Sequence, residues 1–275
     1  MINNVLDISL EILRCPICGH NLELSGNRLK CSGCKRFYDI KGSIIDLLPE
    51  EFVFGSDREW MEFYDKIAPK YFKLFHRIIP VFTLGAEIRA RKQWIKLLEL
   101  ERGDIVLDVS TGTGRNLPYL AKKVGREGIV YGVDISLGML RYAAKISQKM
   151  RNVVLIRANA SHLPFKNECF DAVFHVGGIN TFEEKELAIK EMFRIARPGA
   201  KIVVIDEGLD PKLRNTKRGQ KLLQSNALYA STPPVEEFRK FTNDVSVQWG
   251  FIPNKMFPIW PYYLLEARKP SHKIL

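Results

Sequence analysis

The feature that most constrains the fold of this chain is the stretch of residues 105–115, IVLDVSTGTGR. Its aliphatic and β-branched residues predict a buried parallel strand, residues 110–114 predict a tight glycine turn, and residues 115–123 predict the start of a helix. Because Gly112 and Gly114 lack a Cβ, a ligand can approach the backbone there, beside the unpaired N–H groups of the following helix. The stretch therefore predicts a nucleotide-like ligand at the carboxyl end of a strand.

Two nucleotide-binding motifs are absent from this sequence, and their absence narrows the choice of ligand. The dinucleotide fingerprint G-x-G-x-x-G needs a third glycine, but Leu117 stands three residues after Gly114. The phosphate-binding motif G-x-x-x-x-G-K-[ST] occurs nowhere in the sequence. About twenty residues after the glycines, Asp134 ends a predicted strand, where a carboxylate can accept both hydroxyls of a ribose. A short glycine loop and an acidic strand end together favour S-adenosylmethionine.

Five short motifs in this chain occur in a familiar order. They are residues 106–114 (VLDVSTGTG), 134–140 (DISLGML), 163–165 (LPF), 170–173 (FDAV) and 197–200 (RPGA). As a set, they resemble the motifs of class I methyltransferases over roughly residues 60 to 206. The resemblance implies an S-adenosyl-L-methionine-dependent methyltransferase. It also implies a set of cofactor-binding residues: Asp108, Ser110, Gly112, Gly114, Asp134, Ile135, Met139, Asn159, Ala160 and Val176.

One residue departs from the pattern of such families. They often carry Asp at the position of Asn159, where it accepts a hydrogen bond from the adenine amino group. The amide oxygen of Asn can also accept, so we expect adenine recognition to persist with different electrostatics.

From residue 103 onward, the sequence alternates strands and helices. Strands are predicted at 105–109, 130–134, 153–157, 172–176 and 202–206, and the alternation of apolar strands with helices predicts a parallel sheet covered on both faces. Two further candidate strands, 245–249 and 262–267, are expected to form an antiparallel hairpin by analogy with class I methyltransferases. The predicted fold class is α/β, with a doubly wound, Rossmann-like, mostly parallel seven-stranded sheet and a small N-terminal zinc ribbon.

The zinc ribbon is predicted from two C-x-x-C pairs, Cys15 with Cys18 and Cys31 with Cys34. Each pair can place two thiolates on one side of a tight turn, and four thiolates form a closed tetrahedral zinc site. Residues 21–30 read as a hairpin between the pairs. Two disulfides are the less favoured alternative, because no export signal accompanies the cysteines. Such a site has no open coordination position, so the predicted metal is structural.

Residues that follow the cysteines also carry a resemblance. Residues 37–49 (FYDIKGSIIDLLP) look like the tail of the small zinc-ribbon subunits that activate tRNA and protein methyltransferases. The ribbon is also similar to the N-terminal domain of bacterial 23S ribosomal RNA guanine-N1 methyltransferases, which use a histidine where this chain has Cys34. The predicted domains are a zinc ribbon at 1–50 and a methyltransferase domain at 58–275, with a helical lid at 58–100 and an insertion at 207–240.

Residues 60–71 (WMEFYDKIAPKY) resemble the segment before the core of ubiquinone and menaquinone biosynthesis C-methyltransferases. The resemblance implies a lid helix over the cofactor that contacts the acceptor. Tyr64 and Tyr71 would share one face if the helix continues through Pro69. Core packing is the alternative role for each aromatic ring.

Two residues are candidates for catalysis. His175 ends the fourth parallel strand, where class I methyltransferases face the transferred methyl group, and is a candidate general base or a packed core residue. Asp206, with its neighbour Glu207, ends the fifth strand and is an alternative base. A dedicated base is optional, because the sulfonium methyl is already activated and the protein mainly aligns the reactants.

A net charge of +11 indicates three kinds of possible partner: nucleic acid, an anionic surface or an acidic substrate. Two basic clusters contribute to it: Arg141, Lys145, Lys149, Arg151 and Arg157, and then Lys212, Arg214, Lys217, Arg218 and Lys221. No run of apolar residues is long enough to span a membrane and no signal peptide is indicated, so a cytoplasmic location is expected.

The leading functional prediction is methyl transfer to a small, hydrophobic or aromatic acceptor. The alternatives are an rRNA or tRNA base methyltransferase of the guanine-N1 type and a non-catalytic, cofactor-binding zinc protein.

Overall fold

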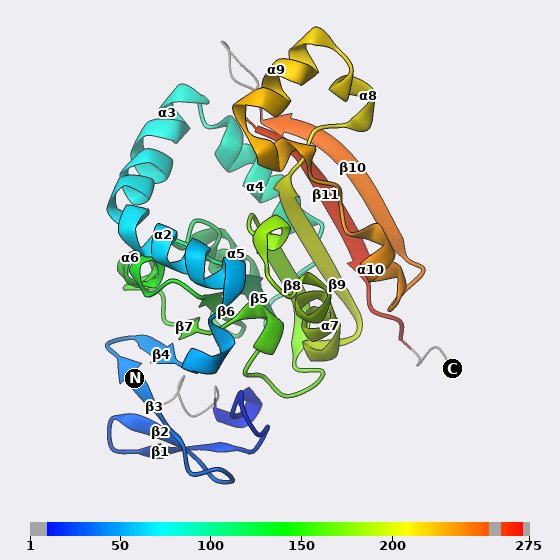
Figure 1. Ribbon diagram of the computed structural model, residues 1–275. Coiled ribbons are helices and arrows are strands. Elements are labelled where there is room, and N and C mark those ends of the chain that lie inside the picture. Colours follow the sequence, from blue (N-terminus) through cyan, green and yellow to red (C-terminus); the bar gives the residue numbers. More distant parts are fainter. Residues whose placement is uncertain (1–9, 253–259, 272–275) are drawn as a thin grey trace.

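The computed structural model describes residues 10–252 and 260–271, and their eleven strands form one sheet, in the order β1-β2-β3-β4-β7-β6-β5-β8-β9-β11-β10 (Figure 1). The central strands are parallel, and the hairpin at one edge is antiparallel to β9. The seven strands that were predicted for the core are β5 (Ile105–Val109), β6 (Ile129–Asp134), β7 (Val153–Arg157), β8 (Phe170–Val176), β9 (Ala196–Glu207), β10 (Val245–Ile252) and β11 (Trp260–Arg268). The predicted α/β class and the mostly parallel order of these seven strands are confirmed, but the whole sheet is larger than predicted and mixed, because the N-terminal strands extend it with antiparallel pairings.

Residues 197–200, the last of the five motifs, lie inside β9. The ladder to β8 pairs Phe170 with Ala196 but Ala172 with Lys201, so these residues bulge out of the regular register. The positive φ of Gly199, +82°, accommodates the bulge.

The N-terminal segment is a small antiparallel sheet of β1 (Leu22–Ser25), β2 (Arg28–Cys31) and β3 (Phe37–Lys41), and it includes the predicted hairpin between the cysteine pairs. The strand β4 (Ile44–Asp46) then pairs with β3 on one side and runs parallel to β7 on the other. An ion pair of 3.2 Å joins Arg157 Nη1 to Asp46 Oδ2 across this junction. The ribbon therefore continues the main sheet, as seen at the bottom of Figure 1. The domain boundaries given above stay predictions.

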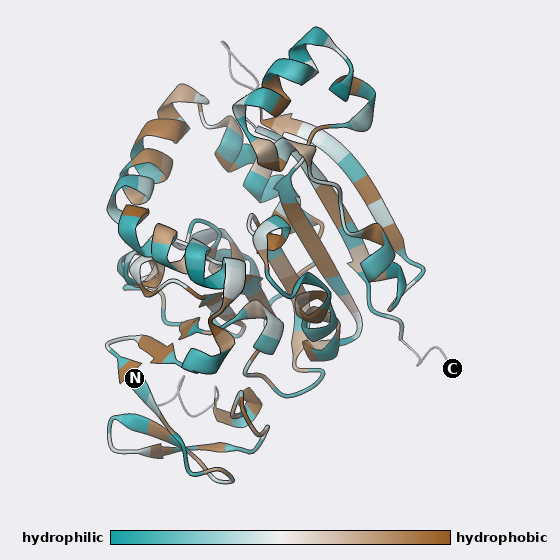
Figure 2. Cartoon of the chain, in the orientation of Figure 1, coloured by the Kyte–Doolittle hydropathy of each residue, from teal (hydrophilic) through white to brown (hydrophobic). Residues whose placement is uncertain are grey.

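Helices cover both faces of the central sheet. One face packs against α4 (Ala86–Lys96), α5 (Leu117–Val124) and α6 (Leu137–Ser147). The other packs against α7 (Lys185–Ile195), α10 (Val235–Arg239) and side chains of the ribbon. Because both faces are covered, the central strands are hydrophobic along most of their length, which Figure 2 shows as brown arrows between helices of mixed colour.

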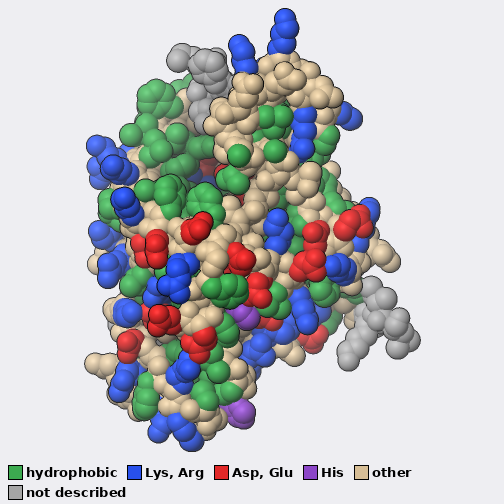
Figure 3. Space-filling model, viewed as in Figure 1, with side chains coloured by type: hydrophobic (Ala, Val, Ile, Leu, Met, Phe, Trp, Pro, Cys, Tyr) green, Lys and Arg blue, Asp and Glu red, His purple; other side chains and the backbone are tan. Residues whose placement is uncertain are grey.

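The helices of two segments, residues 55–82 and 211–225, lie outside these layers. The long helix α2 (Gly55–Lys73) continues through Pro69 into a π-helical turn at Leu74–Ile78 and the short α3 (Ile79–Phe82). Figure 3 shows hydrophobic side chains gathered over this region, where Val81, Phe82 and Leu84 are 70%, 64% and 60% exposed. Between β9 and β10, the predicted insertion holds α8 (Pro211–Arg214), α9 (Lys217–Ser225) and α10. No described helix is both long and apolar enough to cross a membrane.

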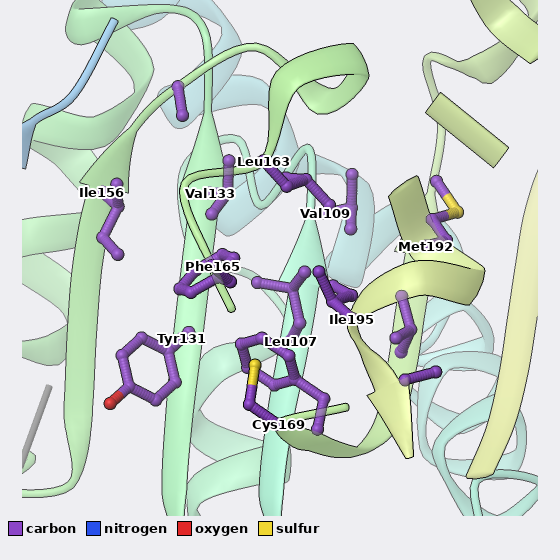
Figure 4. Close-up of a cluster of buried hydrophobic side chains, with 14 of the residues drawn as sticks. Leu107, Val109, Tyr131, Val133, Ile156, Leu163, Phe165, Cys169, Met192 and Ile195 are labelled. Atoms are coloured by element: carbon purple, nitrogen blue, oxygen red, sulfur yellow. The ribbon is translucent and has the colours of Figure 1, made fainter. Parts of the chain in front are cut away.

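A cluster of aromatic and aliphatic side chains fixes the sheet against the segment that precedes β8. Figure 4 shows Tyr131 and Leu107, from β6 and β5, beside Phe165 of the 158–169 connection. Tyr131 and Phe165 pack edge to face, with ring centroids 5.6 Å apart, and both side chains are fully buried. Leu13 of the N-terminal segment pairs with Phe165 in an isolated bridge. The ribbon and the central sheet therefore share one hydrophobic core.

Gly114 is required by the close approach of helix α6. A Cβ at this position would lie 3.1 Å from Ala143 Cα, and its φ is +80°. We predict that Gly114→Ala lowers the free energy of unfolding by about 2 to 4 kcal/mol, from backbone strain plus overpacking. Urea denaturation measures the change. Gly26, with φ +60° and open space around it, is the matched control, and its Ala variant should lose only about 1 to 2 kcal/mol. Equal losses in both variants would contradict the packing role.

Candidate functional site

The glycine turn after β5 exposes backbone to a cavity at the carboxyl edge of the sheet. Ser110 and Gly112 both line this cavity, with φ of +54° and +57°. At Gly112 an added Cβ would meet no atom closer than 4.0 Å, so glycine is used there for its conformation and for access. The backbone N–H of Gly112 donates to Asp134 Oδ2 at 2.7 Å, which ties the ends of β5 and β6 together.

Asp134 presents a half-buried carboxylate to the same cavity. Its Oδ1 accepts a second backbone hydrogen bond, from Ser136 N at 2.9 Å. Burial raises the pKa of Asp134 to about 6, although the two backbone N–H groups oppose this shift. Each carboxylate oxygen can accept two hydrogen bonds, so both retain capacity for a ligand hydroxyl. Ile135 and Met139, which follow in the sequence, line the cavity beside it.

Asp108 was predicted to contact the cofactor, but the structure places it beneath the turn. It is fully buried, does not line the cavity, and accepts from Thr111 Oγ1 at 2.6 Å and Asn116 Nδ2 at 2.9 Å. Burial raises its pKa to about 6. Its role in this geometry is to hold both ends of the glycine turn. Gly114 likewise lies outside the cavity wall, where α6 packs against it.

Asn159 is bonded to a residue that sequence reasoning missed. Its Nδ2 donates to Asp57 Oδ2 and to Phe52 O, both at 2.8 Å, while its Oδ1 accepts from Ser161 N. Asp57 comes from the first turn of α2, is 7% exposed and lines the cavity together with Asn159. Burial raises the pKa of Asp57. A carboxylate therefore lies in this part of the cavity, but it belongs to Asp57 of helix α2 and not to position 159.

Helix α2 lies over the cavity and is fastened at two points. Asp65 Oδ1 accepts from Ser136 Oγ at 2.5 Å and from Gly138 N at 2.7 Å, at the start of α6. At the N-terminus of the helix, Ser56 N donates to Glu183 Oε2 at 2.7 Å. The helix continues through Pro69, and the rings of Tyr64 and Tyr71 pack edge to face 6.0 Å apart on the cavity side.

The cavity, of about 150 Å³, brings together most of the predicted cofactor residues. Those that line it are Ser110, Gly112, Asp134, Ile135, Met139, Asn159, Ala160 and Val176, and the predicted catalytic Asp206 lines it as well. The wall also includes Asp57, Trp60 and Phe182, which were not among the predicted site residues. The resemblance of residues 60–71 to a lid pointed toward Trp60, but no motif marks Asp57 or Phe182.

His175 does not reach the cavity. It is fully buried, its Nδ1 lies 3.1 Å from Val109 O, and its Nε2 accepts from Ile179 N at 3.0 Å. Burial lowers its pKa to about 4. With both ring nitrogens bonded to backbone, His175 holds the loop after β8, and the geometry favours the packed-core role over that of a general base.

Asp206 lines the cavity, but its carboxylate is already bonded to the chain. Oδ2 accepts from Gly178 N at 3.2 Å and Asn180 N at 2.9 Å, and Oδ1 accepts from Glu207 N at 2.8 Å. Burial and the neighbouring Glu207 carboxyl raise the pKa of Asp206 well above its ordinary value. Through its bonds to Gly178 N and Asn180 N, the Asp206 carboxyl shapes the loop after β8.

A second cavity, of about 270 Å³, adjoins the first. Six residues line both: Tyr64, Tyr71, Val176, Gly177, Asp206 and Glu207. The rest of its wall is mostly apolar. It includes five aromatic residues, Phe63, Phe75, Trp94, Trp260 and Tyr262, and three charged ones, Glu87, Arg91 and Arg115. A flat apolar molecule in this second space would therefore lie directly beside the contents of the first.

The four cysteines of the ribbon converge, as predicted. Their sulfur atoms all lie within 4.8 Å of one another, with Cys15 Sγ 3.7 Å from Cys34 Sγ and Cys18 Sγ 3.3 Å from Cys31 Sγ. None of the four is in a disulfide. The Tyr38 hydroxyl, 3.0 Å from Cys15 Sγ, can donate to a thiolate there. The donor set and its spacing fit a structural zinc ion.

Comparison with known proteins agrees with this geometry. Residues 107–204 match the family model described as methyltransferase domain, and residues 8–43 match the model of Trm112p-like proteins. Residues 107–204 are therefore similar to a methyltransferase domain. The chain's N-terminal ribbon is Trm112p-like, which confirms the predicted resemblance to methyltransferase activators.

The similarity to individual relatives and solved structures covers more of this chain than either family model does. The chain is 33% identical over 145 residues to a demethylmenaquinone methyltransferase of Listeria monocytogenes, covering 52% of this chain and 60% of the relative. It is 36% identical over 146 residues to the demethylmenaquinone methyltransferase of Lactiplantibacillus plantarum, with the same two coverages. The matched region thus spans about 60% of these relatives.

Two solved structures share the fold of this chain. One is from the complex between the Haloferax volcanii Trm112 methyltransferase activator and its proposed methyltransferase, with a TM-score of 0.54 and 17% identity over 75% of this chain and 97% of that one. The other is phosphoethanolamine N-methyltransferase 2 of Haemonchus contortus in complex with S-adenosyl-L-methionine, with a TM-score of 0.51 and 16% identity over 72% and 60%.

The ribbon beside the methyltransferase domain leads to a prediction about zinc. We expect one zinc ion per chain by native mass spectrometry and loss of that ion in Cys18→Ser, because three thiolates bind the metal less tightly than four. Cys169→Ser is the control, since Cys169 is a buried thiol outside the cluster and should leave zinc content unchanged. A fully zinc-loaded Cys18→Ser protein would refute the ligand assignment.

Proposed function

We propose that this chain is an S-adenosylmethionine-dependent methyltransferase that acts on a small, hydrophobic or aromatic acceptor of the quinone class. The observation that carries the proposal is the pair of adjoining cavities, one lined by the glycine turn and Asp134 and the other by aromatic rings. The names of the relatives, demethylmenaquinone methyltransferases, support the same acceptor class.

The residues of the first cavity fit the cofactor. Ser110 and Gly112 would hold its amino-acid portion against exposed backbone, and Asp134 would accept from the ribose hydroxyls. Asn159, Ala160 and Asp57 would surround the base. When bound, S-adenosylmethionine supplies an electrophilic methyl group.

The chain's own contribution is to align the acceptor and exclude water. Tyr64 and Tyr71, on the lid helix α2, line the region shared by both cavities. Gly177 leaves space there, because an added Cβ would meet no atom within 4 Å. We propose Glu207, half-buried beside Asp206, as the group that takes up a proton when the acceptor loses one, with Asp206 positioning it.

RNA binding, contact with an anionic surface and a cytoplasmic location stay predictions from the sequence. Of the first basic cluster, Arg157 is turned inward to Asp46 and Ile135 O, and so is not available to a polyanion. The exposed apolar tip of α3 favours contact with an apolar phase over RNA.

The decisive test of the proposal is the role of Asp134. We expect calorimetry to show binding of S-adenosylhomocysteine, weakening as the pH falls below about 6, because the protonated carboxyl accepts less well from the ribose hydroxyls. Asp134→Asn should lower the affinity by about tenfold or more and remove most of this pH dependence.

Asp39→Asn, at an exposed position of the ribbon, is the control and should bind like the unmodified protein. Failure of the unmodified protein to bind S-adenosylhomocysteine would refute the proposal.

A second test concerns Asp57, which we propose as the acceptor for the adenine amino group. Asp57→Ala should abolish the preference for S-adenosylhomocysteine over its inosine analogue, in which an oxo group replaces that amino group. We expect a preference of about tenfold in the unmodified protein and in the control Glu62→Ala, an exposed position on the same helix. A preference that survives in Asp57→Ala would assign base recognition to Asn159 alone.

A further inference from the structure

The wall of the second cavity holds a buried cluster of charged residues that methyl transfer to a neutral acceptor does not use. Glu87 and Arg91 lie on α4, and Arg115 follows the glycine turn. Their side chains are only 1%, 12% and 9% exposed. Two guanidinium groups share one carboxylate here, so the cluster carries one excess positive charge in an aromatic surrounding.

The hydrogen bonds of the cluster leave donors unused. Arg91 bonds through Nε to Glu87 Oε1 and donates through Nη1 to Asn116 Oδ1 at 2.6 Å. Arg115 Nη2 lies 2.5 Å from Glu87 Oε2, and its guanidinium stands 5.1 Å from the ring centre of Phe75. Each guanidinium has five N–H groups, and within residues 10–252 and 260–271 no second carboxylate pairs with either arginine.

The excess positive charge contributes to a lowered pKa of the neighbouring His76. His76, whose Nε2 lies 2.9 Å from Thr113 Oγ1, has its pKa lowered to about 4 by burial and by the positive charges of Arg115 and Arg91. The pKa of Arg115 is itself lowered to about 10 by burial and by Arg91, so it is still charged near neutral pH. An uncompensated buried charge of this kind is costly unless a counter-ion binds there.

The other carboxyl groups of the cavity do not supply that counter-ion. Asp206 and Glu207, on β9, line the same space, but in the described chain neither forms an ion pair with Arg91 or Arg115. Asp206 is instead satisfied by three backbone N–H groups. Neither arginine lines the first cavity, where the ribose- and base-binding residues lie.

We propose that Arg91 and Arg115 bind a carboxylate or phosphate group of the methyl acceptor, while the aromatic wall of the second cavity holds its apolar part. The planar donor fork of arginine suits such anions, which it can bind through paired hydrogen bonds. The inference rests on the proposed methyltransferase function and refines it: the quinone-class or aromatic acceptor carries an acidic group, which the two arginines bind.

A pair of matched probes tests the inference. In the full chain loaded with S-adenosylhomocysteine, calorimetry should show that 1-naphthoate binds more tightly than 1-naphthalenemethanol, which has the same rings without the charge, by about tenfold or more. Arg115→Met and Arg91→Met should each bring the two affinities close together. In each variant the remaining arginine still pairs with Glu87, and thermal melting checks that the fold is kept. Arg89→Met, an exposed position on the same helix, should leave the preference unchanged.

Each outcome decides one question. Equal binding of the two probes to the unmodified protein, or a preference that persists in both variants, would overturn the inference and leave the cluster as a structural ion network. If Arg115→Met instead weakens S-adenosylhomocysteine but leaves 5′-methylthioadenosine and 1-naphthoate unaffected, the anion bound is the carboxylate of the cofactor's amino acid, and the assignment to the acceptor is wrong. Absence of S-adenosylhomocysteine binding would count against the proposed function itself.

Discussion

The hydrogen bond from Gly112 N to Asp134 Oδ2 is the interaction around which the candidate site is built. It joins the carboxyl ends of two neighbouring parallel strands, so the bare backbone of one lies against the carboxylate of the other. That arrangement requires β5 and β6 to be adjacent, which the helices on both faces of the sheet enforce. Beneath the turn, Asp108 holds Thr111 and Asn116 in place. The layers of the fold therefore determine the geometry of a few polar groups at one edge.

Much of this could be predicted from the sequence, because the determinants are local. The apolar strand β5, its glycine turn and the acidic end of β6 lie within thirty residues of one another, and each has a distinct residue pattern. The cysteine pairs are equally local. The same reasoning identified Ser110, Gly112 and Asp134, all of which line the cavity.

Other parts of the site depend on contacts between distant segments, which no local pattern records. Asp57 meets Asn159 across 102 positions of the chain, and the ion pair between Asp46 and Arg157 spans 111. His175 looked suitable for catalysis by position, but only tertiary packing reveals that both its nitrogens face backbone. The parallel pairing of β4 with β7 was also not foreseen, since a strand of three residues gives a weak signal.

The lid helix α2 contributes Asp57 to the base end of the first cavity and Tyr64 and Tyr71 to the boundary with the second. A ligand that stabilises the closed helix in one cavity therefore alters the affinity of the other cavity for its own ligand, and by thermodynamic reciprocity the coupling acts equally in both directions. If the chain acts as proposed, release of the spent cofactor would require this helix to move, and the hydrogen bonds that fasten Asp65 to the start of α6 would then open. The pace of turnover would then be governed by how often this one helix lifts, rather than by the speed of the chemical step.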